Sequence, residues 1–247
     1  MDEEALFEAL DEKPTVPNNN QSNYNNYKSN NGYNKRPNNM LWEKTDFKPT
    51  PVNSNKFNRT GKSFVMYGFV PYDTTVPEEV IMKFTKIATH LAGKGYTYRY
   101  CGTERDTIQN AVLSIENLSK KTYLGWPNCN PNIKEPTMKY ANELGYSTTM
   151  AYHNGFLKFK PAGRALLAAK THAMLGENVD NPTNLIIVYN STGDIAMTKE
   201  TNWKNMGDIG LFMKIAKDAS IPLFNIGNEK NSLELTEYLK SLTQQPS

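Results

Sequence analysis

Residues 93–107 read GKGYTYRYCGTERDT, and this stretch decides the fold of the chain. Aromatic and threonine residues over positions 96–100 favour a β-strand. The tight turn Cys101-Gly102-Thr103 follows at once, and we expect a helix from there to about Leu118. A strand that passes through a glycine turn into a helix is the building unit of an α/β sheet. Backbone N–H groups and the positive end of the helix meet at such a turn, so an anion can bind there.

Two arginines flank this turn. Arg99 precedes it and Arg105 follows it, and both can add positive charge beside a bound phosphate. Every strand–helix connection in an α/β sheet needs a turn of this kind, however. The local sequence therefore leaves two interpretations open, an anion site and an ordinary connection.

Outside this stretch, strand-like and helix-like segments alternate. We expect further strands over residues 64–70, 121–125, 185–189 and 221–226. We expect helices over residues 77–93, 136–144, 161–175, 207–219 and 232–242. This alternation predicts an α/β fold with a doubly wound, mostly parallel, Rossmann-like sheet of about five strands.

Charge is distributed unevenly along the chain. Residues 1–12 contain six acidic residues, and residues 13–62 contain nine Lys or Arg against two acids. From residue 63 onward, 19 basic residues nearly balance 17 acidic ones. Such asymmetry indicates interaction segments joined to a neutral domain. We therefore divide the chain into an N-terminal arm, residues 1–60, and an α/β domain, residues 61–247.

The arm is expected to be disordered. Eleven of the 23 residues from 17 to 39 are Asn, and little in this segment can be buried in a core. Tyrosine rings stack on unpaired bases at about 1–3 kcal/mol per base, and cations between them neutralise phosphates. The alternative is a tail that only keeps the protein hydrated. The rings and cations concerned are Tyr24, Tyr27, Tyr33, Lys35, Arg36 and Trp42.

Residues 3–10 form a distinct acidic tip. Leu6, Phe7 and Leu10 would share one side of a short helix, with acids elsewhere. A helix of this length is not stable alone. The tip is thus either a peptide that folds on binding a partner or a frayed end.

The composition argues against several classes of protein. Cys101 and Cys129 are too few for a disulfide scaffold or a cysteine metal site. No apolar segment is long enough for a signal peptide or for a membrane span of about 20 residues. We expect a cytoplasmic protein without membrane contact, bound metal or cofactor.

The order and spacing of the turns resemble one superfamily, which unites the DNA-processing protein A family with the lonely-guy phosphoribohydrolases. The chain is most similar to its phage-encoded Rossmann-like members. Residues 101–106 stand where these carry a GGARGAD-like turn, and residues 123–127 loosely match a Leu-Pro-Trp-like turn. After the apolar strand 185–189, residues 207–210 replace a GGTGQA-like turn, and residues 221–225 match the family's ending.

The resemblance implies a nucleotide or phosphate site at two turns, through Gly102, Asp106, Gly207 and Gly210. The first turn has lost its other glycines, and side chains there keep the backbone further from a pyrophosphate. The hydrolase pattern PGGxGTxxE is also absent, and no glutamate follows Gly210 in residues 211–213. Without that carboxylate, cleavage of a sugar bond is disfavoured, so we expect no enzymatic activity.

These observations lead to one main hypothesis, a non-enzymatic single-stranded DNA-binding protein of phage origin in the host cytoplasm. The acidic tip would recruit a polymerase or replication protein, and homo-oligomer formation stays open. One alternative is a small-nucleotide sensor or nucleotide-processing enzyme that uses the glycine turns, and another is an assembly protein that binds only proteins. In the main hypothesis, the cations of the domain that contact phosphates are Arg99, Arg105, Lys158, Lys160 and Arg164.

Overall fold

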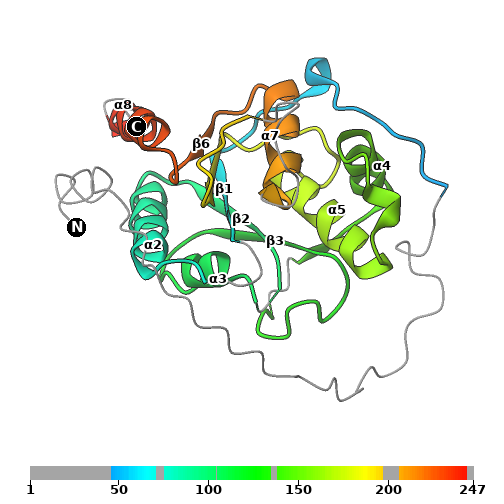
Figure 1. The fold of residues 1–247 in the computed structure, drawn as a ribbon, viewed down its shortest axis with the longest axis horizontal. Coiled ribbons are helices and arrows are strands. Elements are labelled where there is room, and N and C mark those ends of the chain that lie inside the picture. The colour runs from blue at the N-terminus through cyan, green and yellow to red at the C-terminus, as the bar shows by residue number, and fades with distance from the viewer. Residues whose placement is uncertain (1–45, 71–74, 104, 135–137, 197–205, 244–247) are drawn as a thin grey trace.

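The computed structural model describes residues 46–70, 75–103, 105–134, 138–196 and 206–243. These residues form one parallel sheet of six strands in the order β4-β3-β2-β1-β5-β6. The predicted α/β, doubly wound sheet is confirmed, with six strands rather than about five (Figure 1). The strands are β1 Ser63–Phe69, β2 Thr97–Cys101, β3 Lys120–Leu124, β4 Lys139–Tyr140, β5 Leu185–Asn190 and β6 Leu223–Asn225.

Helices cover both faces of the sheet. One face carries α2 Glu78–Gly93, α3 Thr107–Leu113 and α8 Glu229–Thr243, and the other carries α4 Glu143–Tyr152, α5 Pro161–Leu175 and α7 Ile209–Asp218 (Figure 1). Two short 3₁₀ helices, η2 Ser54–Lys56 and η3 Phe156–Lys158, lie in connections. The sheet therefore separates two hydrophobic layers.

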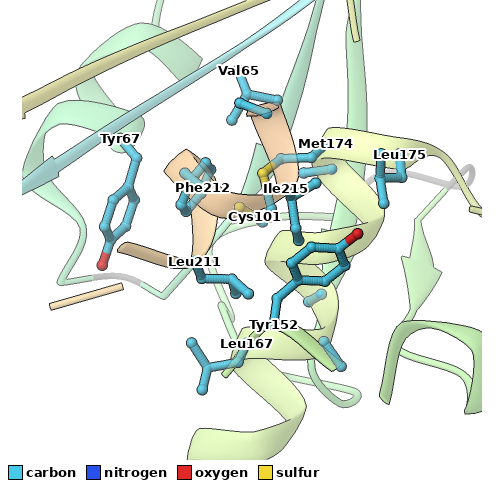
Figure 2. Packing of buried hydrophobic residues seen from close by; sticks show 14 of the residues in the cluster. Val65, Tyr67, Cys101, Tyr152, Leu167, Met174, Leu175, Leu211, Phe212 and Ile215 are labelled. Carbon is cyan, nitrogen blue, oxygen red and sulfur yellow. The ribbon is translucent and has the colours of Figure 1, made fainter. Parts of the chain in front are cut away.

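The central strand β1 supplies side chains to both layers. Val65 and Tyr67 pack under α5 and α7, whereas Phe64 and Met66 pack against α2. Figure 2 shows the first of these layers, where Tyr67 stacks on Phe212 with ring centroids 5.3 Å apart. Strands buried on both faces read as continuous apolar runs, which is why the sequence predicted β1 and β5 closely.

Two element predictions were wrong in their bounds. The helix expected to run to Leu118 ends at Leu113, and Asn117 adopts a positive φ of 60° that a helix does not allow. The helix expected over residues 136–144 was also wrong. Lys139–Tyr140 form the short strand β4 instead, and α4 starts at Glu143, after Asn142. The Asn142 side chain accepts the N–H groups of Leu144 and Gly145, and this cap fixes the helix start.

Residues 46–60, the last part of the predicted arm, lie against the folded domain. The Phe47 ring is buried and stacks on Tyr146 with centroids 4.8 Å apart. The Val52 N–H donates to the Tyr152 hydroxyl at 3.2 Å, and the Arg59 guanidinium donates to the Ala219 carbonyl at 2.7 Å. The other arm residues, with their predicted disorder, lie outside the described residues. In the described ranges, no helix has the length and apolar character needed to cross a bilayer.

Close packing of α4 on α5 centres on His172. Its Nε2 accepts the Asn142 N–H at 3.3 Å, so the proton lies on Nδ1, which donates to the Gly176 carbonyl at 3.0 Å. Burial lowers the pKa of His172, in keeping with a neutral ring. Gly145 leaves room for this ring, because a Cβ there would lie 2.4 Å from His172 Nε2.

We predict that Gly145→Ala destabilises the protein by about 1–3 kcal/mol, because the added methyl group forces His172 or α5 to move. In an open helix the same change stabilises by up to about 1 kcal/mol. Gly93→Ala, at the end of α2 with no atom within 4 Å of the new Cβ, is the matched control. Urea unfolding measures both variants, and equal unfolding midpoints for the two would contradict the packing described.

Candidate functional site

The strand order defines where a ligand is expected. From β1 the chain winds outward through β2, β3 and β4, then returns to the other side of β1 with β5 and β6. The connections after β1 and β5 therefore leave toward opposite faces of the sheet, through α2 and α7. In open α/β sheets, ligands bind outside the carboxyl ends of the strands at this switch point.

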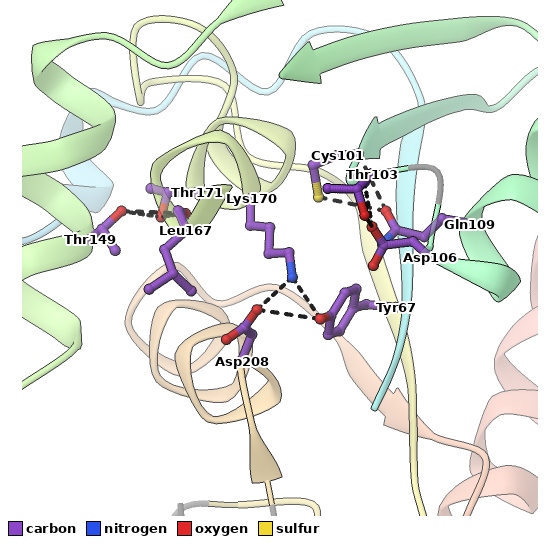
Figure 3. A network of polar contacts seen from close by, with 10 residues as sticks. All are labelled: Tyr67, Cys101, Thr103, Asp106, Gln109, Thr149, Leu167, Lys170, Thr171 and Asp208. Atoms are coloured by element: carbon purple, nitrogen blue, oxygen red, sulfur yellow. Dashed lines mark hydrogen bonds and ion pairs between the residues drawn. The ribbon is translucent and has the colours of Figure 1, made fainter. Parts of the chain in front are cut away.

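A buried lysine lies close to this point (Figure 3). Lys170 projects from α5, is 4% exposed, and donates to Asp208 Oδ2 at 2.5 Å and to the Tyr67 hydroxyl at 2.6 Å. The same ammonium lies 3.8 Å from the centroid of the Tyr67 ring. Tyr67 also donates to Asp208 Oδ2 at 3.3 Å. We call Tyr67, Lys170 and Asp208 the lysine cluster.

The lysine cluster is charged. Burial alone would lower the pKa of Lys170, but the Asp208 carboxylate and other groups nearby, including Asp106, hold this pKa well above its ordinary value. Burial raises the pKa of Tyr67, so its hydroxyl stays neutral and can donate to Asp208. Lys170 is thus an ammonium without a lone pair for nucleophilic attack. Its chemistry here is that of a fixed cation, tying α5 to β1 and to the start of α7.

The glycine turn after β2 is already filled by an internal anion. The Asp106 carboxylate accepts from the Thr103 N–H and, at 3.1 Å, from the Thr103 hydroxyl. Gly102 makes room for it, since a Cβ there would lie 2.5 Å from Asp106 Oδ2. The geometry therefore disfavours a phosphate in the turn, because Asp106 both occupies the donors and repels another anion.

The second glycine pair, Gly207 and Gly210, serves packing at the start of α7. Gly207 has a positive φ of 49°, and a Cβ there would lie 2.3 Å from the Phe69 ring. Gly210 is buried in the first turn of the helix. Between them, Asp208 is the N-cap residue, but its side chain makes no capping bond and instead binds Lys170. These glycines bring α7 close to the end of β1.

A hollow of about 360 Å³ lies beside the ends of β1 and β2. It is lined by the end of β1, the β1–α2 connection, the β2–α3 connection and the first turn of α3, including Phe69, Val76, Arg105, Asp106 and Gln109. The Gln109 side chain is buried, and its Oε1 accepts the Cys101 N–H at 3.4 Å. Its Nε2 has no hydrogen-bond partner among the described residues. Buried polar groups are nearly always paired, so this amide needs an explanation.

The structure separates the five predicted cations of the domain. Arg99 is 4% exposed on β2 and donates to the Asn181 carbonyl at 2.7 Å, and Arg164 is equally buried on α5. Neither can reach the phosphates of a nucleic acid on the surface. The remaining three, Arg105, Lys158 and Lys160, are exposed. The predicted base-stacking residues and their cations, Tyr24, Tyr27, Tyr33, Lys35, Arg36 and Trp42, lie outside the described residues.

Comparison with known proteins identifies no relative: no family model, curated protein or solved structure matches the chain. The superfamily resemblance therefore stays a prediction. A search of the described residues also finds no group of three or more His, Cys, Asp or Glu side chains placed to hold a metal ion.

Sequence reasoning missed the lysine cluster and Gln109. The one available signal was Lys170, a lone cation within the apolar stretch ALLAAKTHAML of the expected helix. A charged residue on a buried helix face needs a partner, and Asp208 follows far along the chain. No sequence feature indicated a binding role for Gln109, because a glutamine on a helix is usually solvated.

We predict that Asp208→Asn destabilises the protein by about 3 kcal/mol, because it leaves a buried ammonium without a counter-charge. Lys170→Met should cost less, since Asp208 is partly exposed and water can solvate its carboxylate. The double variant should then lose less stability than the two single variants lose in sum. Urea unfolding of the four proteins tests this, and strictly additive effects would show that the ion pair contributes nothing.

Proposed function

We propose that the chain binds a small nucleotide-type ligand, a nucleoside or nucleoside phosphate, in the hollow at the ends of β1 and β2. The observation that carries this proposal is the unpaired Gln109 amide. A buried donor without an acceptor costs about 1–3 kcal/mol. Gln109 lines the hollow, so a small shift of its side chain would let a ligand oxygen or ring nitrogen accept from the amide and remove that cost.

The other groups around the hollow suit the same ligand class. Arg105 is exposed at the site, and a guanidinium recognises a phosphate by paired hydrogen bonds. The Asp106 carboxylate has more lone pairs than Thr103 uses, and ribose hydroxyls can donate to the rest. The volume of the hollow lies at the lower end of the range typical of small-molecule sites.

We propose binding without catalysis. The charged Lys170 is held by Tyr67 and Asp208, so these groups are engaged with one another. Asp106 is likewise engaged in its own turn. This arrangement supports a sensor or carrier more than a hydrolase.

Isothermal titration with nucleosides and their mono-, di- and triphosphates tests the proposal. Arg105→Gln should weaken a phosphorylated ligand about tenfold, through loss of one charge-assisted hydrogen bond, and leave the nucleoside unaffected. Gln109→Glu should weaken both, because an acceptor replaces the donor. Lys158→Gln, an exposed cation outside the hollow, is the matched control. The proposal fails when no compound binds or when Arg105→Gln and Lys158→Gln behave alike.

A second candidate is single-stranded DNA binding, with recruitment of a polymerase or replication protein through the acidic tip. The observation that favours it is the segment from Lys158 to Lys160, where two exposed lysines flank the Phe159 ring, itself 40% exposed. Together with the cations and tyrosines of residues 13–45, this segment offers both charge and stacking to unpaired bases.

A salt titration of oligonucleotide binding tests this candidate. The comparison should use a chain without residues 1–45, because residues 46–60 pack on the domain and their removal would expose Tyr146. We expect weaker binding and a flatter salt dependence, because each phosphate that the arm no longer neutralises reduces the log–log slope by about 0.7. Far-ultraviolet circular dichroism controls for folding. Unchanged affinity in the shortened chain would rule out the arm as a DNA-binding element.

A further inference from the structure

A second hollow, of about 670 Å³, lies between the end of α4 and α7. We call it the α4–α7 groove. Its apolar lining includes Met213 and Ala216 of α7, Leu223 of β6 and Ile195, which is 49% exposed. The hollow therefore offers space and apolar contacts to the side chains of a docked segment.

In the described part of the chain, two lysines and one acid line the α4–α7 groove, and one of the lysines, Lys214, already donates to the Tyr152 carbonyl at 3.3 Å. Lys214 and Lys217 line it, and the exposed Arg59 binds the Ala219 carbonyl at the end of the same helix. Among the described residues that line the groove, the one acid is Asp218, which accepts a hydrogen bond from the Tyr152 hydroxyl at 2.9 Å. The groove thus favours an apolar segment that carries negative charge.

The chain itself reaches this place. Phe47 stacks on Tyr146 of α4, and the Val52 N–H donates to Tyr152, which lines the groove. Residues 47–52 therefore run along α4 to the edge of the groove. The 45 residues before Asp46 are thus attached near the start of α4, one helix length from the groove.

We infer that the acidic tip, residues 3–10, binds the α4–α7 groove of its own chain. Leu6, Phe7 and Leu10 supply the apolar side chains, and the six acids of residues 1–12, with no Lys or Arg among them, match the cations. A flexible linker of 35 residues, the number from 11 to 45, would span roughly 30 Å, enough to reach around α4. Such tethering gives an effective concentration in the millimolar range. Bound in the groove, the tip is withheld from other partners.

Competition with a free peptide tests this inference in the full chain. The probe is a fluorescein-labelled peptide of residues 1–12, MDEEALFEALDE. The full-length Phe7→Ser variant should bind it at least about tenfold more tightly than the unmodified chain, because the tethered tip no longer competes. Adding Lys217→Glu should weaken the peptide again. Lys230→Glu, an exposed lysine of α8 on the opposite face of the sheet, is the matched control and should have no effect.

Three outcomes would overturn the inference. The first is equal affinity of the peptide for the two full-length chains, including no binding to either. The second is the same effect from Lys217→Glu and Lys230→Glu, which would place the peptide elsewhere. The third is a difference between the chains that disappears on dilution, together with dimers in sedimentation, which would assign the groove to the tip of a second copy. Circular dichroism of each variant separates these outcomes from misfolding.

Discussion

The contact of Lys170 with Asp208 and Tyr67 is the constraint on which the arrangement of this fold depends. It joins α5, the start of α7 and the central strand β1 beside the switch point of the sheet. A buried ammonium is tolerated only with a counter-charge, so α7 must begin where Asp208 can reach it. Gly207 makes that start feasible, because any side chain there would meet the Phe69 ring. The need to pair the Lys170 ammonium with Asp208 thus determines how α7 and its layer of helices pack on the sheet.

The apolar pattern of the sequence made the sheet predictable, whereas its short polar elements could not be predicted. Leu185–Asn190 and Pro161–Leu175 appear almost as expected, because a continuous apolar run and a glycine-ended amphipathic stretch each have one good structural solution. Strand β4 has two residues and no apolar alternation, so nothing in the sequence marked it. At the site, the burial of Arg99 could likewise not be predicted from the sequence. A cation next to a glycine turn suggests a surface contact, whereas in the fold Arg99 lies on an inner strand whose face is covered by α5 and by the segment at Asn181.

The turn after β2 explains why a resemblance to a phosphate-binding turn does not determine its ligand. A turn that exposes N–H groups attracts any anion, and the nearest one here is the carboxylate of Asp106, three residues beyond Thr103. Gly102 is required for this internal contact as much as it would be for a phosphate. The polar groups that can still bind a ligand lie in the neighbouring hollow, and they are Gln109 and Arg105.

The segment before the first strand links the charge pattern of the sequence to the folded domain. Phe47 and Val52 attach it to α4, so the described chain from Asp46 onward runs along this helix to the α4–α7 groove. An acidic segment tethered next to cations competes with any other anion for them, at a concentration set by the linker. In the inferred arrangement, the acidic tip would act on the lysines of the groove before it acts on another partner. If the tip occupies the groove as inferred and the arm binds nucleic acid as proposed, the salt dependence of that binding would report both contacts, the one made and the one released.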